Sequence, residues 1–187
     1  MIELAANKHV QWTARGMPPL TRDVNWLKEI MKDYQFRVSI IGIPKLYRII
    51  ELSENCTFDN FHLAIFDAFD RYDPHLYSFF ITKADTRNMR SIINSPEITH
   101  HQNTRDPMGF GRKKKSASKA KIGSVGLAEN DVFHYLFDFG DDWWHRIRVE
   151  KIIEGENNSK RVRLIKAVGK APPQYPDEGD YFEDEDE

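Results

Sequence analysis

The sequence has little that would tie it to an oxidising compartment or to a bilayer. Cys56 is its single cysteine, so the chain cannot form an internal disulfide. Its longest apolar runs are about one strand long, far below the roughly 18 residues that span a bilayer. The first residues show no basic start followed by an apolar run. These absences predict a cytoplasmic protein without a membrane partner.

Signatures of known catalytic and metal sites are also missing. The sequence contains no G-x-S-x-G, no H-E-x-x-H and no paired C-x-x-C. The triplet Asp138-Phe139-Gly140 matches a kinase motif, but no glycine-rich phosphate loop and no H-R-D accompany it. We therefore favour a protein that is not an enzyme and leave any cofactor unassigned.

Charge is distributed unevenly along the chain. Residues 177–187 hold eight acidic residues and no basic one, so residues 1–176, with 27 basic and 21 acidic residues, carry +6. This split fits nucleic-acid binding with the tail as a competitor, or a basic protein partner for the tail. It also fits a solvated loop and a solubilising tail. The basic residues that would contact nucleic acid are clustered in one loop: Arg112, Lys113, Lys114, Lys115, Lys119 and Lys121.

Apolar periodicity predicts an alternation of strands and helices in the first half. Helical spacing marks residues 22–33 and, after a capping Thr57, residues 57–70. Residues 36–43 and 46–52 have extended character on either side of Pro44, and residues 75–82 form another strand. The first half therefore reads β-β-α-β, with a helix covering one face of a sheet.

The second half predicts a hairpin. Residues 83–121 are polar and lack periodicity, which is typical of a long connection. Beyond it, residues 132–139 and 143–153 form two strands around a turn at Gly140, and residues 160–168 form a last strand.

Together these elements predict an α+β fold. It would be a single curved, mainly antiparallel sheet of about five or six strands. One long amphipathic helix and a shorter N-terminal helix would cover it. We expect an N-terminal extension with a short helix at 1–35, a single core domain at 36–170 with a polar basic loop at about 83–121, and an acidic tail at 171–187.

The stretch around the predicted hairpin carries a family resemblance. The string FDFGDDWWHRIRVEKI, which starts at Phe137, and the preceding AENDVFHYL resemble the core motif of the Ri-plasmid open-reading-frame-three-like family. Upstream, residues 36–82 are similar to the opening segment of that family, a strand pair and a helix followed by W-x-x-x-H-L. Tyr72 stands where tryptophan is expected, and His75-Leu76 complete the pattern.

The closing segment resembles the family less completely. Gly169 and Pro172-Pro173 match its G-x-x-x-x-P-P-E-D-x-G-G pattern, but QYPDEGD replaces the compact acidic-glycine run. Some members of the family are described as passenger proteins of insertion elements. The resemblance therefore implies a fold and a link to mobile elements, while the family's biochemical role is unsettled.

The register of the hairpin decides which side chains meet. A turn with an even number of residues would place Asp138 on the same face as His145. A three-residue turn would instead place Asp138 near Trp144 and Arg146. The sequence leaves both registers open, and an aspartate at a hairpin end also hydrogen-bonds turn N–H groups without any other role.

Two functional hypotheses follow from the same strands. One is a metal-dependent enzyme or a small-ligand site, where carboxylates, imidazole and indole converge. Its residues would be Asp138, Asp141, Asp142, Trp143 and His145. The other is a nucleic-acid-binding module in which strand aromatics stack on bases and basic side chains hold phosphates. Its strand residues would be Trp144, Arg146 and Arg148, beside the basic loop.

Overall fold

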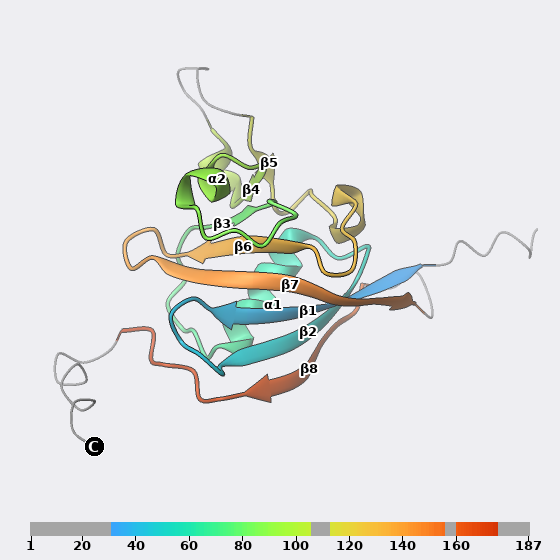
Figure 1. The fold of residues 1–187 in the computed structure, drawn as a ribbon. Coiled ribbons are helices and arrows are strands. Elements are labelled where there is room, and N and C mark those ends of the chain that lie inside the picture. The colour runs from blue at the N-terminus through green and yellow to red at the C-terminus, as the bar shows by residue number, and fades with distance from the viewer. Residues whose placement is uncertain (1–30, 106–112, 156–159, 176–187) are drawn as a thin grey trace, which may run out of the picture.

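One sheet of eight strands organises the protein (Figure 1). The computed structural model describes residues 31–105, 113–155 and 160–175. The strands are β1 (Lys32–Ile40), β2 (Tyr47–Ser53), β3 (Tyr77–Phe80), β4 (Glu97–Thr99), β5 (Lys115–Ser116), β6 (Val132–Phe137), β7 (Trp143–Glu154) and β8 (Val162–Val168). The α-helices are α1 (Phe58–Ala68) and α2 (Met89–Ile93), and the 3-10 turns are η2 (His101–Thr104) and η3 (Ile122–Val125).

The strands follow the order β5-β4-β3-β6-β7-β1-β2-β8 across the sheet. The predicted hairpin is confirmed, because β6 and β7 pair antiparallel with Phe137 opposite Trp143 and Tyr135 opposite His145. Residues 138–142 therefore form a loop of five residues. An odd loop places residues of equal parity on one face, so Phe137, Tyr135 and His145 share a side of the sheet.

The core lies between this face and α1. Thr57 begins the helix with a capping box, in which the backbone N–H of Asn60 donates to Thr57 Oγ1 and the Asn60 side chain accepts from the backbone N–H of Thr57. Phe61 then enters the centre of the core, where it is fully buried. Its ring centroid lies 4.6 Å from that of Phe36 and 5.7 Å from that of Phe79. Aromatic burial thus fixes the helix on the sheet.

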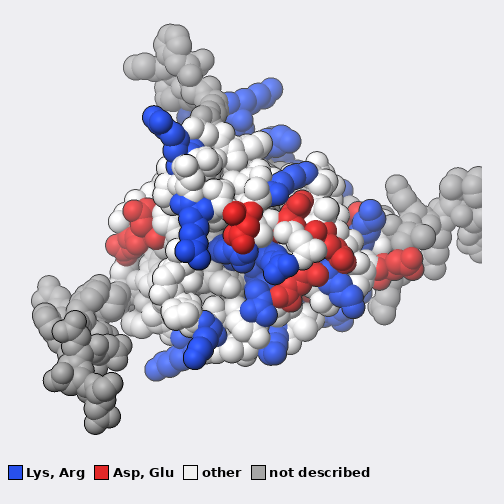
Figure 2. All heavy atoms as spheres, in the orientation of Figure 1, with Lys and Arg blue, Asp and Glu red and all other residues white. Residues whose placement is uncertain are grey.

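The opposite face is partly open and charged. α2 covers one end of it, where Ile92 packs with Phe80, Leu136 and Trp144. Elsewhere arginines pair with acids, as in the bidentate contact of Arg146 with Asp85. Figure 2 views this face and shows basic and acidic side chains intermixed over the centre of the sheet.

The predicted fold class is wrong in three respects. The sheet has eight strands instead of five or six, and it is mixed because β4 and β5 pair in parallel. Strands β4 and β5 both lie within the predicted connection 83–121. They have three and two residues, which is too short to show periodicity. No long amphipathic helix covers the sheet, since α1 spans only 11 residues. Asp70 ends it by adopting a positive φ of 53°.

Several predictions fall outside the described residues. Most of the predicted helix 22–33 lies outside the described residues, and its residues 32 and 33 belong to strand β1. Arg112 and the acidic residues 177–187 also lie outside, and the domain boundaries stay a prediction. In the ranges that the structure describes, no helix is both long and apolar enough to cross a membrane.

Phe61→Ala should lower the free energy of unfolding by about 3–5 kcal/mol, because it removes a buried ring from a closely packed cluster. The matched control is Leu63→Ala, on the same helix but 51% exposed, which should change stability by less than about 0.5 kcal/mol. Urea denaturation measures both. Equal losses for the two variants would contradict the placement of α1.

Candidate functional site

Three segments that are far apart in the sequence meet at one end of the sheet. They are the β6–β7 loop at 138–142, the chain after α1 at 70–76, and the chain after β8 at 169–175 (left in Figure 1). Gly169 makes the return from β8 with φ of 77°, and an added Cβ there would lie 3.0 Å from Leu46 Cδ1. Only glycine suits both the backbone and this close approach.

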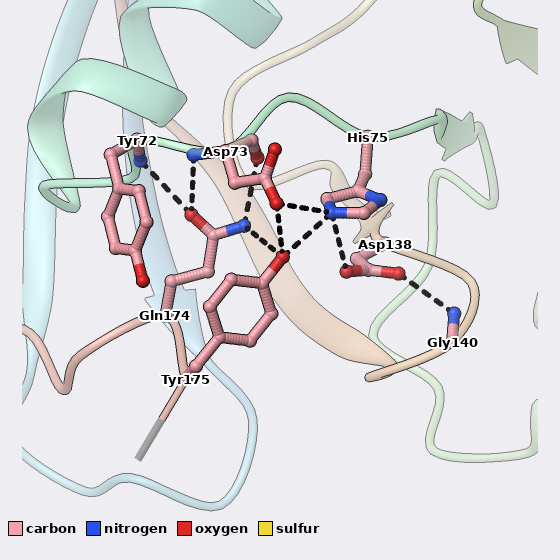
Figure 3. A network of polar contacts seen from close by, with 7 residues as sticks. All are labelled: Tyr72, Asp73, His75, Asp138, Gly140, Gln174 and Tyr175. Carbon is pink, nitrogen blue, oxygen red and sulfur yellow. Dashed lines mark hydrogen bonds and ion pairs between the residues drawn. The ribbon is translucent and has the colours of Figure 1, made fainter. Parts of the chain in front are cut away.

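His75 lies at the centre of the polar network that joins the segments (Figure 3). Its Nε2 is 2.8 Å from the hydroxyl oxygen of Tyr175, 3.3 Å from Asp73 Oδ2 and 3.5 Å from Asp138 Oδ2. The Tyr175 hydroxyl itself donates to Asp73 Oδ2 at 2.8 Å. Because the hydroxyl hydrogen of Tyr175 is directed to Asp73, the Tyr175 oxygen accepts from His75 Nε2–H, and this nitrogen lies among side chains of all three segments.

Gln174 secures the C-terminal segment against the chain after α1. Its Oε1 accepts from the backbone N–H groups of Tyr72 and Asp73, each at 3.0 Å, and its Nε2 donates to the Asp73 carbonyl at 2.8 Å (Figure 3).

The hydrogen bond from the Tyr175 hydroxyl to the Asp73 carboxylate raises the pKa of Tyr175 to about 12, and the same bond lowers the pKa of Asp73. The tyrosine therefore stays a neutral donor at neutral pH.

Asp138 shapes the hairpin loop as well as contacting His75. It adopts φ of 57°, a left-handed conformation that aspartate tolerates better than most residues. Its Oδ1 accepts from the backbone N–H of Gly140 at 2.9 Å, and its backbone N–H donates to the Leu76 carbonyl at 3.0 Å. One buried carboxylate thus holds the turn and joins it to the neighbouring segment.

A pocket of about 560 Å³ opens beside this network. Its wall combines carboxylates, indole and phenol rings, and an apolar edge from the β1–β2 turn. Arg71 lies behind Trp143, with its guanidinium carbon 3.9 Å from the indole centroid, and donates to the Pro172 carbonyl. The lining residues are Ile40, Ile41, Ile43, Asp141, Asp142, Trp143, Trp144, Gln174 and Tyr175.

The candidate ligand residues from the sequence divide between pocket and core. Asp141, Asp142 and Trp143 line the pocket, and Asp138 lies in the adjoining network. His145 instead faces α1, with its ring 5.2 Å from both Phe69 and Tyr135. In the part of the chain that the structure describes, no three His, Cys, Asp or Glu side chains are grouped so that they could hold a metal ion.

Two buried histidines are held neutral. His145 Nδ1 donates to the Trp143 carbonyl at 2.9 Å, and its Nε2 is buried without a hydrogen-bond partner among the described residues. Burial lowers the pKa of His145 to about 3. His62, stacked on Tyr77 and hydrogen-bonded to the Tyr135 hydroxyl, has its pKa lowered by burial to about 4.

The candidate nucleic-acid residues lie in two separate groups on the sheet. Lys113, Lys114 and Lys115 lie at β5, while Trp144, Arg146 and Arg148 lie on β7, four strand spacings away, or about 19 Å. Lys121 donates to Asn55 and Lys119 is exposed, whereas Arg148 donates to Asn130 and Arg146 pairs with Asp85. Trp144 packs on Phe80 with ring centroids 5.5 Å apart.

Several residues of this region were missed by the sequence analysis. Asp73, Gln174 and Tyr175 carry no motif of their own, and their contacts join residues about 100 positions apart. One signal was available, since the family-like H-L and P-P patterns stand beside them in the sequence. Two patterns that belong to one family, though far apart in the sequence, are candidates for contact in the folded protein.

Comparisons with known proteins show the family of this chain. Residues 32–182 match the family described as plasmid pRiA4b ORF-3-like protein. The chain belongs to this family. A crystal structure of a protein of unknown function from Methanosarcina mazei Go1 is similar, with a TM-score of 0.61 and 29% identity over 78% of this chain and 74% of that one. No curated protein matches the chain.

The lowered pKa values of His62 and His145 predict that the stability of this family member is sensitive to acid. The unfolded chain binds a proton at each near pH 6.5, whereas the folded protein does so only near pH 3 to 4. Their contribution is therefore complete above pH 6.5, decreases progressively as the pH falls below 6.5, and is lost once the pH has fallen through the folded pKa values. Between pH 6.5 and 5, the free energy of unfolding should decrease by up to about 1.4 kcal/mol per pH unit for each histidine.

Urea denaturation at several pH values tests this expectation. His62→Gln and His145→Gln should each make the slope between pH 5 and 6.5 shallower, whatever their effect on stability at neutral pH. The exposed His101 supplies the control His101→Gln, which should leave the slope unchanged. Unaltered slopes in both buried variants would show that these imidazoles titrate normally in the folded protein.

Proposed function

We propose that this protein is a binding module whose ligand is a small organic cation, an amine or a guanidinium compound. The observation that carries the proposal is the pocket at the hairpin end, where the three family-like segments meet beside the His75 network. The acidic groups at its wall are those of Asp141 and Asp142, and both are exposed to an incoming ligand.

The composition of the wall suits a cation with an apolar body. Indole and phenol faces attract ammonium and guanidinium groups, and the lining residues include Trp144 and Tyr175. Carboxylates add charge-assisted hydrogen bonds. Ile40, Ile41 and Ile43 offer apolar contact for the rest of the ligand. Among the described residues that line the pocket there is no lysine or arginine, so none of them competes with a cationic ligand.

Nucleic acid is a weaker candidate for this surface. Base stacking needs exposed rings, but Tyr135 and Phe137 are buried. Phosphate contacts need available cations, but Arg146 carries a bidentate contact to Asp85. A divalent metal is weaker too, because the described residues offer no grouped ligands for one. An organic cation needs neither feature.

Titration of ¹⁵N-labelled protein by NMR tests the proposal, with butylguanidinium and tetramethylammonium as probes. The indole N–H signals of Trp143 and Trp144 should shift in a saturable manner. Butyrate, which has an apolar chain and the opposite charge, should cause no such shift. Asp141→Asn and Asp142→Asn should each weaken binding by about fivefold, the value of one exposed charge pair.

Asp67→Asn is the matched control, because Asp67 is exposed on α1 and does not line the pocket. It should leave the dissociation constant unchanged. Asparagine keeps the tolerance for a positive φ that Asp142 requires, so a loss of binding there reports the charge. If neither probe shifts the indole signals, or if all three variants bind equally, the proposal is wrong.

A further inference from the structure

A second cavity, of about 380 Å³, lies at the β5 edge of the sheet and is basic. It is bounded by the chain that follows β3, by β4, β5 and η3. Lys83, Lys113 and Lys115 form its polar side together with a single acid, Glu97, and Ile81 and Ile98 contribute apolar wall. Two of these lysines belong to the basic run that the sequence analysis singled out and that the proposed function does not use.

The charge of this cavity is not balanced by its own carboxylate. Glu97 Oε1 accepts from Ser78 Oγ at 2.8 Å and pairs with Lys114 Nζ at 3.3 Å. Within the described ranges, no carboxylate pairs with Lys83, Lys113 or Lys115. Arginines on the outer face of the sheet are paired with carboxylates instead, Arg37 with Glu150 and Arg146 with Asp85.

Figure 2 makes the same contrast visible. On the face in view, basic side chains and no acidic ones are visible at the upper end of the molecule, whereas acids and bases intermix over the central strands. Three ammonium groups around one cavity repel one another, and an anion in their midst would relieve that repulsion. The surface charge therefore favours an anionic occupant.

Lys83 is held in place in a way that a solvated lysine is not. Its backbone has a φ of 51°, a left-handed conformation that is uncommon for residues other than glycine and costs of the order of 1 kcal/mol. Its Nζ donates to the Gly126 carbonyl at 2.7 Å, next to η3. This hydrogen bond orders the ammonium group at the cavity and leaves its two other N–H groups for a ligand.

We propose that this cavity binds the polyphosphate group of a small ligand, with Lys83, Lys113 and Lys115 as the cationic contacts. Lysine ammonium groups bind phosphate oxygens as point charges from several directions. The volume lies within the range of small-molecule pockets. The site is separate from the pocket at the hairpin, so it neither requires nor excludes the organic cation proposed there.

Isothermal titration calorimetry with inorganic triphosphate in 20 mM salt tests the proposal on the full chain. We expect saturable binding that weakens as the salt concentration rises. Lys83→Gln and Lys115→Gln should each weaken it by about fivefold, and their combination should weaken it further. Lys151→Gln removes an exposed lysine of β7 that is not part of the cavity, and it should bind like the unchanged protein.

A single-stranded oligonucleotide, added at the same phosphate concentration, distinguishes a small polyphosphate ligand from the phosphates of a nucleic acid. Tighter binding of triphosphate than of the oligonucleotide supports a compact polyphosphate ligand. Binding of the oligonucleotide alone overturns the proposal, as does the absence of any triphosphate binding. It is also overturned if Lys83→Gln and Lys115→Gln, with unchanged melting temperatures, bind triphosphate as tightly as Lys151→Gln.

Discussion

The register of β6 against β7 is the constraint on which the rest of the structure depends. Five residues, 138–142, separate the two strands, so Tyr135 stands opposite His145 and Phe137 opposite Trp143. Because side chains alternate between the faces of a strand, a shift by one residue would move every one of them to the other face. The observed register sends His145 and Ile147 into the aromatic core beneath α1 and leaves Trp144 and Arg146 on the outer face.

The same loop brings the family-like segments together. Asp138 bends the chain through its contact with the Gly140 N–H and also faces His75, which in turn contacts Tyr175 from the C-terminal segment. None of these side chains, considered alone, indicates a function. Their contacts bring segments more than 60 residues apart in the sequence together beside one acidic and aromatic pocket.

The sequence predicted the local features and not the long-range ones. The hairpin around Gly140 and the cap at Thr57 were predicted correctly, because turn residues and capping residues act over only a few positions. The register was left open, since loop length depends on where pairing begins. β4 and β5 were missed because strands of three and two residues show no periodicity, and because their positions are set by pairing, β4 with β3 and β5 with β4. The contacts of Gln174 were missed for a similar reason, as nothing near it in the sequence marks its partners.

The most direct test of this account is an NMR measurement of the cross-strand pairing of β6 and β7 in the 22.0 kDa protein. Backbone nuclear Overhauser effects between directly opposed residues report which pairs face one another. The account predicts contacts that place Tyr135 opposite His145 and Leu136 opposite Trp144. Contacts that place Tyr135 opposite Trp144 or Arg146 would contradict the register, and with it the assignment of side chains to core and pocket.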